Sequence, residues 1–181
     1  LFRLGITENG RSRWWPKKKF KNKLEEDFVI RNAIKGKIKQ AGIIRIDIER
    51  TADNAFKIGI KVARPGLVIG RGGKGIEDLS KLIESKYMSL QRKRGIKNAK
   101  VSLSLNVEDL KRSEASASYM AQVVAWDIEK RMPPRRVIKK YLEWIMQNKE
   151  VQGAKIRVSG RINGAEISRR EVLAKGKLPL Q

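Results

Sequence analysis

The sequence of 181 residues contains no cysteine and no histidine. Their absence excludes thiol chemistry, disulfide bonds, imidazole catalysis and ordinary zinc sites. No apolar run approaches the roughly 20 residues that cross a bilayer, and no signal peptide is visible. We therefore expect a soluble, intracellular protein that has no membrane partner and no metal site.

Acidic residues are scarce beside basic ones. The chain has 19 Asp and Glu against 42 Lys and Arg, which gives a net charge of +23. Such an excess repels itself and usually serves to bind a polyanion. The basic residues run along the whole chain, whereas a membrane-surface protein tends to confine them to one amphipathic helix or tail. Nucleic acid is the expected partner, and a merely basic surface is the alternative.

Residues 1–23 are expected to form a basic N-terminal arm. Two tryptophans, Trp14 and Trp15, lie among cations that can neutralise phosphates while the aromatic rings stack on bases or sugars. A tail held by the two tryptophans in an apolar groove is equally compatible with this pattern. The arm residues that we assign to RNA binding are Arg11, Arg13, Lys17, Lys18 and Lys19.

Residues 24–106 have the periodicity of one α+β domain. Asn22 and Glu25 resemble a helix-capping pair, and Ile30, Ile34, Ile38 and Ala41 then recur at helical spacing. Alternating residues over 44–49 and 56–62, separated by a turn, predict an antiparallel hairpin. A short apolar turn, a glycine-rich loop, a helix from about residue 76, a basic loop at 92–94 and a strand near 101–105 follow. One three-stranded sheet with its apolar face under helices accounts for this pattern.

The rest of the chain predicts a second, smaller α/β domain. Residues 107–112 are polar and are expected to be a linker, and 113–181 form the C-terminal domain. Helices are expected over 113–131 and 135–149, because Pro133 and Pro134 end one helix and begin another. Two strands joined through Asn163-Gly164 follow, so two helices on a small sheet are predicted.

The glycine-rich loop carries the functional interpretation. Gly70 and Gly73 let the backbone approach a sugar-phosphate chain, and the amides of the next helix favour phosphate. Arg71 and Lys74 add positive charge beside Gly72. This Gly-x-x-Gly pattern between an apolar turn and a helix is that of a type II KH domain, which clamps about four nucleotides. We also place Arg64 in the RNA-binding set.

The same loop matches a dinucleotide fingerprint, Gly70-x-Gly72-x-x-Gly75. A buried strand should then enter the loop directly, and an acidic residue should follow about 20 residues later. Only three apolar residues precede the loop, and they follow a Pro-Gly break. The position where the acidic residue should stand falls in the predicted helix and the basic loop after it. The cofactor interpretation is therefore disfavoured, as is a purely structural glycine turn.

Several further segments resemble one known family, the bacterial-type third protein of the small ribosomal subunit. The resemblance covers nearly the whole chain. Its most specific stretch is the last of the following: Phe2-Arg3-Leu4-Gly5-Ile6, Ile48-Glu49-Arg50, Ala63 to Gly70, Arg135-Arg136, and Val158-Ser159-Gly160-Arg161-Ile162-Asn163-Gly164-Ala165-Glu166-Ile167.

The resemblance implies a structural protein in the head of the small subunit, in the cytoplasm or an organelle, that is not an enzyme and needs no cofactor. Its partners would be the small-subunit rRNA, neighbouring ribosomal proteins and mRNA. The family's mRNA-contacting residues map to Arg135, Arg136 and Lys139, at the channel by which mRNA enters, where structured messages are unwound passively. These three also fall within one helical turn, although a solvated helix end would look the same.

The chain departs from the family pattern at three points. The loop has Arg71-Gly72 where the family has two basic residues, which should weaken phosphate contact. Pro133-Pro134 replace residues that are not both proline. The family has a further strand, helix and strand after Leu180, so the second domain is expected to be incomplete here.

Two rival functions stay open on the sequence. A free KH protein outside the ribosome would have the same loop. An enzyme would have to use carboxylates such as Glu77 and Asp78, whose place at a helix start is explained by the helix dipole alone.

Overall fold

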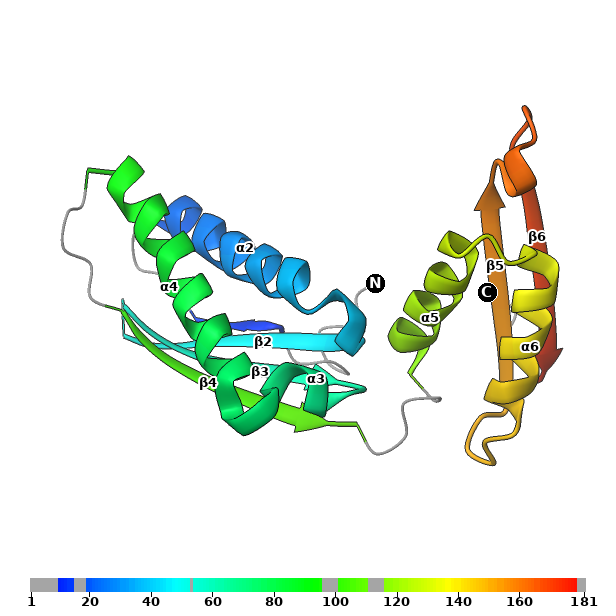
Figure 1. The fold of residues 1–181 in the computed structure, drawn as a ribbon, viewed down its shortest axis with the longest axis horizontal. Coiled ribbons are helices and arrows are strands. Elements are labelled where there is room, and N and C mark those ends of the chain that lie inside the picture. The colour runs from blue at the N-terminus through cyan, green and yellow to red at the C-terminus, as the bar shows by residue number, and fades with distance from the viewer. Residues whose placement is uncertain (1–9, 15–18, 53, 96–100, 111–115, 179–181) are drawn as a thin grey trace. The chain divides into compact units, whose positions relative to one another are not determined.

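The computed structural model describes residues 10–14, 19–52, 54–95, 101–110 and 116–178 (Figure 1). The chain divides into two compact units, Leu1–Leu110 and Lys111–Gln181. The expected helices and strands of both units are present, with several bounds displaced. The elements of the first unit, in chain order, are β1 (Ser12–Arg13), α2 (Phe20–Lys37), η1 (Lys39–Ala41), β2 (Ile43–Ala52), β3 (Ala55–Val62), α3 (Pro65–Ile69), η2 (Arg71–Gly73), α4 (Lys74–Lys93) and β4 (Ser102–Asp109).

The predicted three-stranded sheet is present, and the arm adds a short strand to its edge. The strand order is β1-β2-β3-β4. β2 and β3 form the predicted antiparallel hairpin, with Ile46 opposite Ile60 and Ile48 opposite Ile58. β4 runs parallel to β3, and the two-residue β1 runs parallel to β2. Parallel pairing of β3 with β4 requires a long connection, which α3 and α4 supply.

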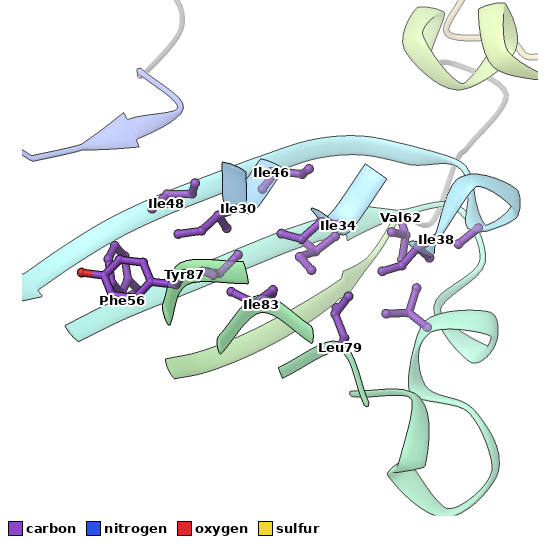
Figure 2. Packing of buried hydrophobic residues seen from close by; sticks show 14 residues of the cluster. Ile30, Ile34, Ile38, Ile46, Ile48, Phe56, Val62, Leu79, Ile83 and Tyr87 are labelled. Atoms are coloured by element: carbon purple, nitrogen blue, oxygen red, sulfur yellow. The ribbon is translucent and has the colours of Figure 1, made fainter. Parts of the chain in front are cut away.

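The core of the first unit lies between this sheet and the helices that cover one of its faces. Figure 2 shows the side chains of α2, α4 and the strands converging there. Ile30, Ile34, Ile38 and Ala41 are all buried, as their helical spacing predicts. Alternate residues of the strands form the sheet side of this core, because every second side chain of a strand faces the same way. The buried cluster is Ile30, Ile34, Ile38, Ala41, Ile46, Ile48, Phe56, Ile58, Ile60, Val62, Val68, Leu79, Ile83 and Tyr87.

Three local expectations for the first unit are wrong. α2 begins at Phe20 within the expected arm, and its N-cap is Lys19, with φ 62° and no side-chain cap, so Asn22 and Glu25 do not cap it. The basic segment 92–94 belongs to the last turn of α4 and its C-cap instead of a loop. β4 continues through Asp109 into the expected linker, because its pairing with β3 extends to Val62.

Over residues 116–178, the second unit contains two α-helices, a short 3-10 helix and one two-stranded sheet. α6 packs against both strands, which are antiparallel, with Ile156 opposite Leu173. The predicted turn at Asn163-Gly164 is part of a short 3-10 helix, so the connection between the strands is longer than a tight hairpin turn. The elements are α5 (Ala117–Glu129), α6 (Pro134–Met146), β5 (Gly153–Gly160), η4 (Ile162–Gly164) and β6 (Arg169–Gly176).

Candidate nucleic-acid interface

The loop Gly70–Gly73, called the glycine loop below, has a backbone that only glycine adopts readily. Gly70 has φ 68° and ψ −179°, and Gly72 and Gly73 have φ of 62° and 81°. L-residues rarely enter these regions, because their Cβ would contact the neighbouring peptide. Three such positions in four residues turn the chain sharply between α3 and α4. The glycines are therefore required by the conformation of the loop.

Gly75 lets the start of α4 lie directly against the end of α3. A Cβ on Gly75 would lie 2.3 Å from the Val68 carbonyl oxygen, and one on Gly70 would lie 3.0 Å from the Gly75 amide nitrogen. The 2.3 Å distance is shorter than real Cβ contacts. A larger residue at position 75 would therefore displace α3 or α4. The third glycine of the apparent dinucleotide fingerprint is thus explained by packing of the two helices.

The glycine loop is exposed and has cations on both sides. Gly70, Gly72, Arg71 and Lys74 are exposed, and Arg64 is exposed at the N-cap of α3. Within the described residues, Arg64, Arg71 and Lys74 make no ion pair. α4 begins at Lys74 without a side-chain cap, so its first amides are not satisfied by a side chain. The Lys74 amide donates to the Arg71 carbonyl, and the amides and cations at this helix start attract phosphate.

Two apolar side chains beside the glycine loop were not singled out from the sequence. Leu67 and Ile69 are 58% and 39% exposed, on either side of the buried Val68. The alternation follows from the single turn of α3, which can bury only one face. Exposed aliphatic groups next to a phosphate-binding loop offer an apolar surface to the flat faces of unpaired bases.

The elements around the glycine loop exclude a dinucleotide-binding site of the Rossmann type. In a Rossmann unit a strand enters the glycine turn directly. Here α3 (Pro65–Ile69) stands between β3 and the glycine loop. The motif matches in sequence, but its first glycine follows a helix.

The arm is held on the first unit by specific polar contacts. The Trp14 indole N–H donates to Asp27 Oδ2 at 2.7 Å, and Arg31 donates to the Arg11 carbonyl at 2.7 Å. Arg11 and Arg13 are exposed and Trp14 is half-buried. Trp14 is therefore held by a carboxylate, and its ring also lies against that of Phe20, with centroids 5.6 Å apart. Lys19 is exposed at the start of α2, whereas Trp15, Lys17 and Lys18 lie outside the described residues.

A buried ion network fixes the arm, α2 and α4 to one another. The Arg50 guanidinium donates to Glu26 at 2.7 Å and to Asp27 at 2.6 Å. Arg94, the C-cap of α4, donates to Glu26 at 2.6 Å. Burial, and then the charge of Glu26, raise the pKa of the neighbouring Tyr87. A buried charge is tolerated only when it is paired, so these contacts act together. Nothing in the sequence pattern indicated that Glu26 and Asp27 are buried.

The α6 cluster, defined as Arg135, Arg136 and Lys139, is an exposed group of cations in the second unit. Pro133 is the N-cap of α6 and Pro134 its first residue, so proline starts this helix as predicted. The first turn has no acidic residue, and the cluster has no ion-pair partner among residues that the structure describes. Cations near a helix N-terminus oppose the helix dipole and cost stability. An anionic partner would offset that cost.

Buried contacts fix the position of α6 beneath its cluster. Val137 and Ile138 are fully buried, and the Tyr141 hydroxyl donates to Asp127 Oδ2 at 2.5 Å. Burial, together with this hydrogen bond, raises the pKa of Tyr141 to about 12. Tyr141 therefore stays neutral and keeps α6 joined to α5 at any physiological pH. The helix that carries the α6 cluster is therefore anchored by buried contacts.

The described residues contain no group of three or more side chains that could hold a metal ion. Over the same residues, no helix has the length and apolar character needed to span a membrane.

Each of the two units matches a known protein family. Residues 29–115 match the family model of the KH domain, and residues 124–181 match that of the ribosomal protein S3 C-terminal domain. Small ribosomal subunit protein uS3 of Alkaliphilus oremlandii is 38% identical over 99% of this chain and 70% of its own length. The chain belongs to the uS3 family. Protein uS3 of Dictyoglomus turgidum is 40% identical, over 99% of this chain and 69% of its own length. Protein uS3c of Chlorokybus atmophyticus is 37% identical, over 99% and 78%.

Membership of the uS3 family confirms the resemblance and the KH fold expected from the sequence. The family is one of structural ribosomal proteins rather than of enzymes, and RNA binding in translation follows from it. The individual RNA-binding residues are not tested by these comparisons, and they remain predictions.

Proposed function

We propose that this chain is a structural constituent of the head of the small ribosomal subunit, where its first unit binds rRNA. The observation that supports this most strongly is the exposed glycine loop, in which three positive φ angles and a helix start without a side-chain cap form a cradle for phosphate. Arg71 lies in the loop, Lys74 directly follows it and Arg64 is exposed before α3, while Arg11 and Arg13 lie exposed in the arm.

The second unit supports a role toward mRNA. The α6 cluster lines the channel by which mRNA enters, and its cations hold separated phosphates while the ribosome moves. The energy comes from translocation, since the sequence has no Walker-type Gly-Lys-Ser/Thr loop to bind a nucleoside triphosphate. The unwinding is therefore passive.

Co-sedimentation with small ribosomal subunits through a gradient tests the assembly role. The chain is expected to travel with the subunits, and its affinity for rRNA should fall steeply with salt, because counterions are released on binding. Salt-dependent RNA binding without co-sedimentation would instead indicate a KH protein that acts outside the ribosome.

The role toward mRNA is tested by the double variant Arg135→Ala/Arg136→Ala. Ribosomes that carry it should translate messages with a stable hairpin more slowly, and translate unstructured messages at the normal rate. Lys149→Ala, which removes an exposed cation in the turn after α6, is the control. Equal slowing of both kinds of message would count against this role.

A further inference from the structure

The second unit has a cavity that the proposed function leaves unused. It has a volume of about 580 Å³ and lies between the end of α5, the start of α6 and the loop after β5. Pockets of a few hundred Å³ with apolar walls and a few polar groups are the usual form of small-ligand sites. Here Ile128, Met132 and Ile162 supply apolar walls, and Arg131 and Arg161 supply positive charge.

Arg131 has a backbone conformation that glycine would adopt at lower cost. Its φ is 62°, and it follows the C-cap of α5. The Arg131 amide donates to the Ile128 carbonyl at 2.9 Å, and the Met132 amide donates to the Asp127 carbonyl at 3.2 Å. These two bonds form a Schellman motif, in which this left-handed position is usually glycine. An arginine here is strained, and strain of this kind concentrates at functional sites.

The helix end does not by itself explain the arginine. A cation near a helix C-terminus is favourable, but Lys130 already supplies one, with Nζ 3.6 Å from Asp127 Oδ1. Arg131 is exposed and has no ion-pair partner within the part of the chain that the structure describes. Arg131 lines the cavity, and no ion pair with a described residue engages its guanidinium.

Arg161 faces the same cavity from the loop after β5. Its Nε donates to the Ala165 carbonyl at 2.9 Å, which orients the guanidinium across the turn. Its two terminal amino groups have no acceptor among the described residues. Two guanidinium groups beside an apolar cavity match the chemistry of a nucleotide, because arginine binds phosphate by paired hydrogen bonds and the apolar walls receive the base.

We propose that this cavity binds one unpaired nucleotide of single-stranded RNA, with its base against Met132 and Ile162 and its phosphate on Arg131 and Arg161. The proposal rests on the proposed function and deepens it, since Pro134 lines the cavity and directly precedes Arg135 of the α6 cluster. A strand held by the α6 cluster would thus place one base beside the cavity.

Arg131→Gly is the decisive variant, because it removes the charge and relieves the strained backbone at once. We expect the full chain to melt at an unchanged or higher temperature, while its affinity for single-stranded oligouridine falls several-fold. Arg131→Lys should recover part of the affinity, and Lys149→Ala should lose much less than Arg131→Gly does. An oligouridine that carries 4-thiouridine should photo-crosslink within residues 128–134 or 158–164.

The two proposals fail in different ways. If Arg131→Gly lowers the affinity no more than Lys149→Ala and the crosslinks lie only outside those two segments, the cavity does not hold a nucleotide, although RNA binding stands. If the unmodified chain shows no salt-dependent binding to RNA, the proposed function fails and the cavity proposal fails with it.

Discussion

The glycine loop offers a phosphate its backbone, whereas the α6 cluster offers guanidinium and ammonium groups. In the loop, backbone conformation determines the site, and a single Cβ at Gly75 would meet a carbonyl oxygen at 2.3 Å. In α6 the backbone is an ordinary helix, and three exposed side chains make the site. Substitutions should therefore affect the first site through packing and the second through charge.

Gly75→Ala should have the largest effect on the first unit. Displacing the start of α4 from Val68 should lower the free energy of unfolding by about 1–3 kcal/mol, as overpacking typically does. Affinity for RNA should fall as well, since the loop would move. Urea unfolding with matched RNA titrations measures both.

Gly36→Ala is the matched control for this substitution. Gly36 lies in α2 with open space where a Cβ would be. The same chemical change should therefore stabilise the protein by about 0.5–1 kcal/mol. A similar loss of stability in both variants would refute the packing explanation.

Removal of cations should distinguish the two sites by salt dependence. Each phosphate contact to a single strand contributes roughly 0.7 to the slope of log K against log salt. Arg135→Ala/Arg136→Ala/Lys139→Ala should lower that slope by roughly 2 and remove most of the binding by α6. Arg71→Ala/Lys74→Ala should lower it by less and leave measurable affinity, because the amides remain. Equal losses from both sites would show that the glycine loop, too, binds mainly by charge.

Tyr141→Phe tests the support beneath the α6 cluster. The pKa of Tyr141 is raised in the folded protein to about 12, from about 10 when unfolded, so folding favours the neutral phenol. Its contribution to stability is complete below pH 10 and is lost as the pH rises from about 10 to 12. Urea unfolding at several pH values should show a difference between wild type and Tyr141→Phe that shrinks over this window. A difference that stays constant would indicate that the phenol does not titrate as stated.

Arg135→Glu should have the smallest effect on stability. Unlike most substitutions, it should stabilise the protein. An acidic residue in the first turn of α6 complements the helix dipole, so the free energy of unfolding should rise by about 0.3–1 kcal/mol. RNA affinity should fall, because a cation becomes an anion. Arg135→Gln should lie between the two in both measurements, and a variant that loses stability and affinity together would argue for a structural role of Arg135.

The sequence predicted most of the first unit because its periodic apolar residues are also its core. Ile30, Ile34 and Ile38 at helical spacing, and Ile46 and Ile48 at strand spacing, are buried as expected. It failed at the start of α2, where Lys19 adopts a left-handed conformation without a capping side chain. Capping residues indicate where a helix could begin, but contacts from elsewhere in the chain can extend it.

The candidate site was predicted unevenly. The glycine loop and the α6 cluster follow from residue types close together in the chain. The ion network around Arg50, the exposed Leu67 and Ile69, and the cavity beside Arg131 do not, because each depends on which distant residues become neighbours. Glu26 and Arg94, for instance, are 68 positions apart and meet at 2.6 Å.

By itself, the sequence determined the excess of positive charge, the alternation and helical spacing that specify the α+β units, and the glycines that the loop requires. These are properties of composition and of neighbours along the chain. The tertiary structure decided which charges are buried and paired, such as Arg50, and which remain exposed to meet an anion, such as Arg135 and Arg136. The reason is that a side chain's hydration and its ion pairs depend on contacts in space, which local sequence does not specify.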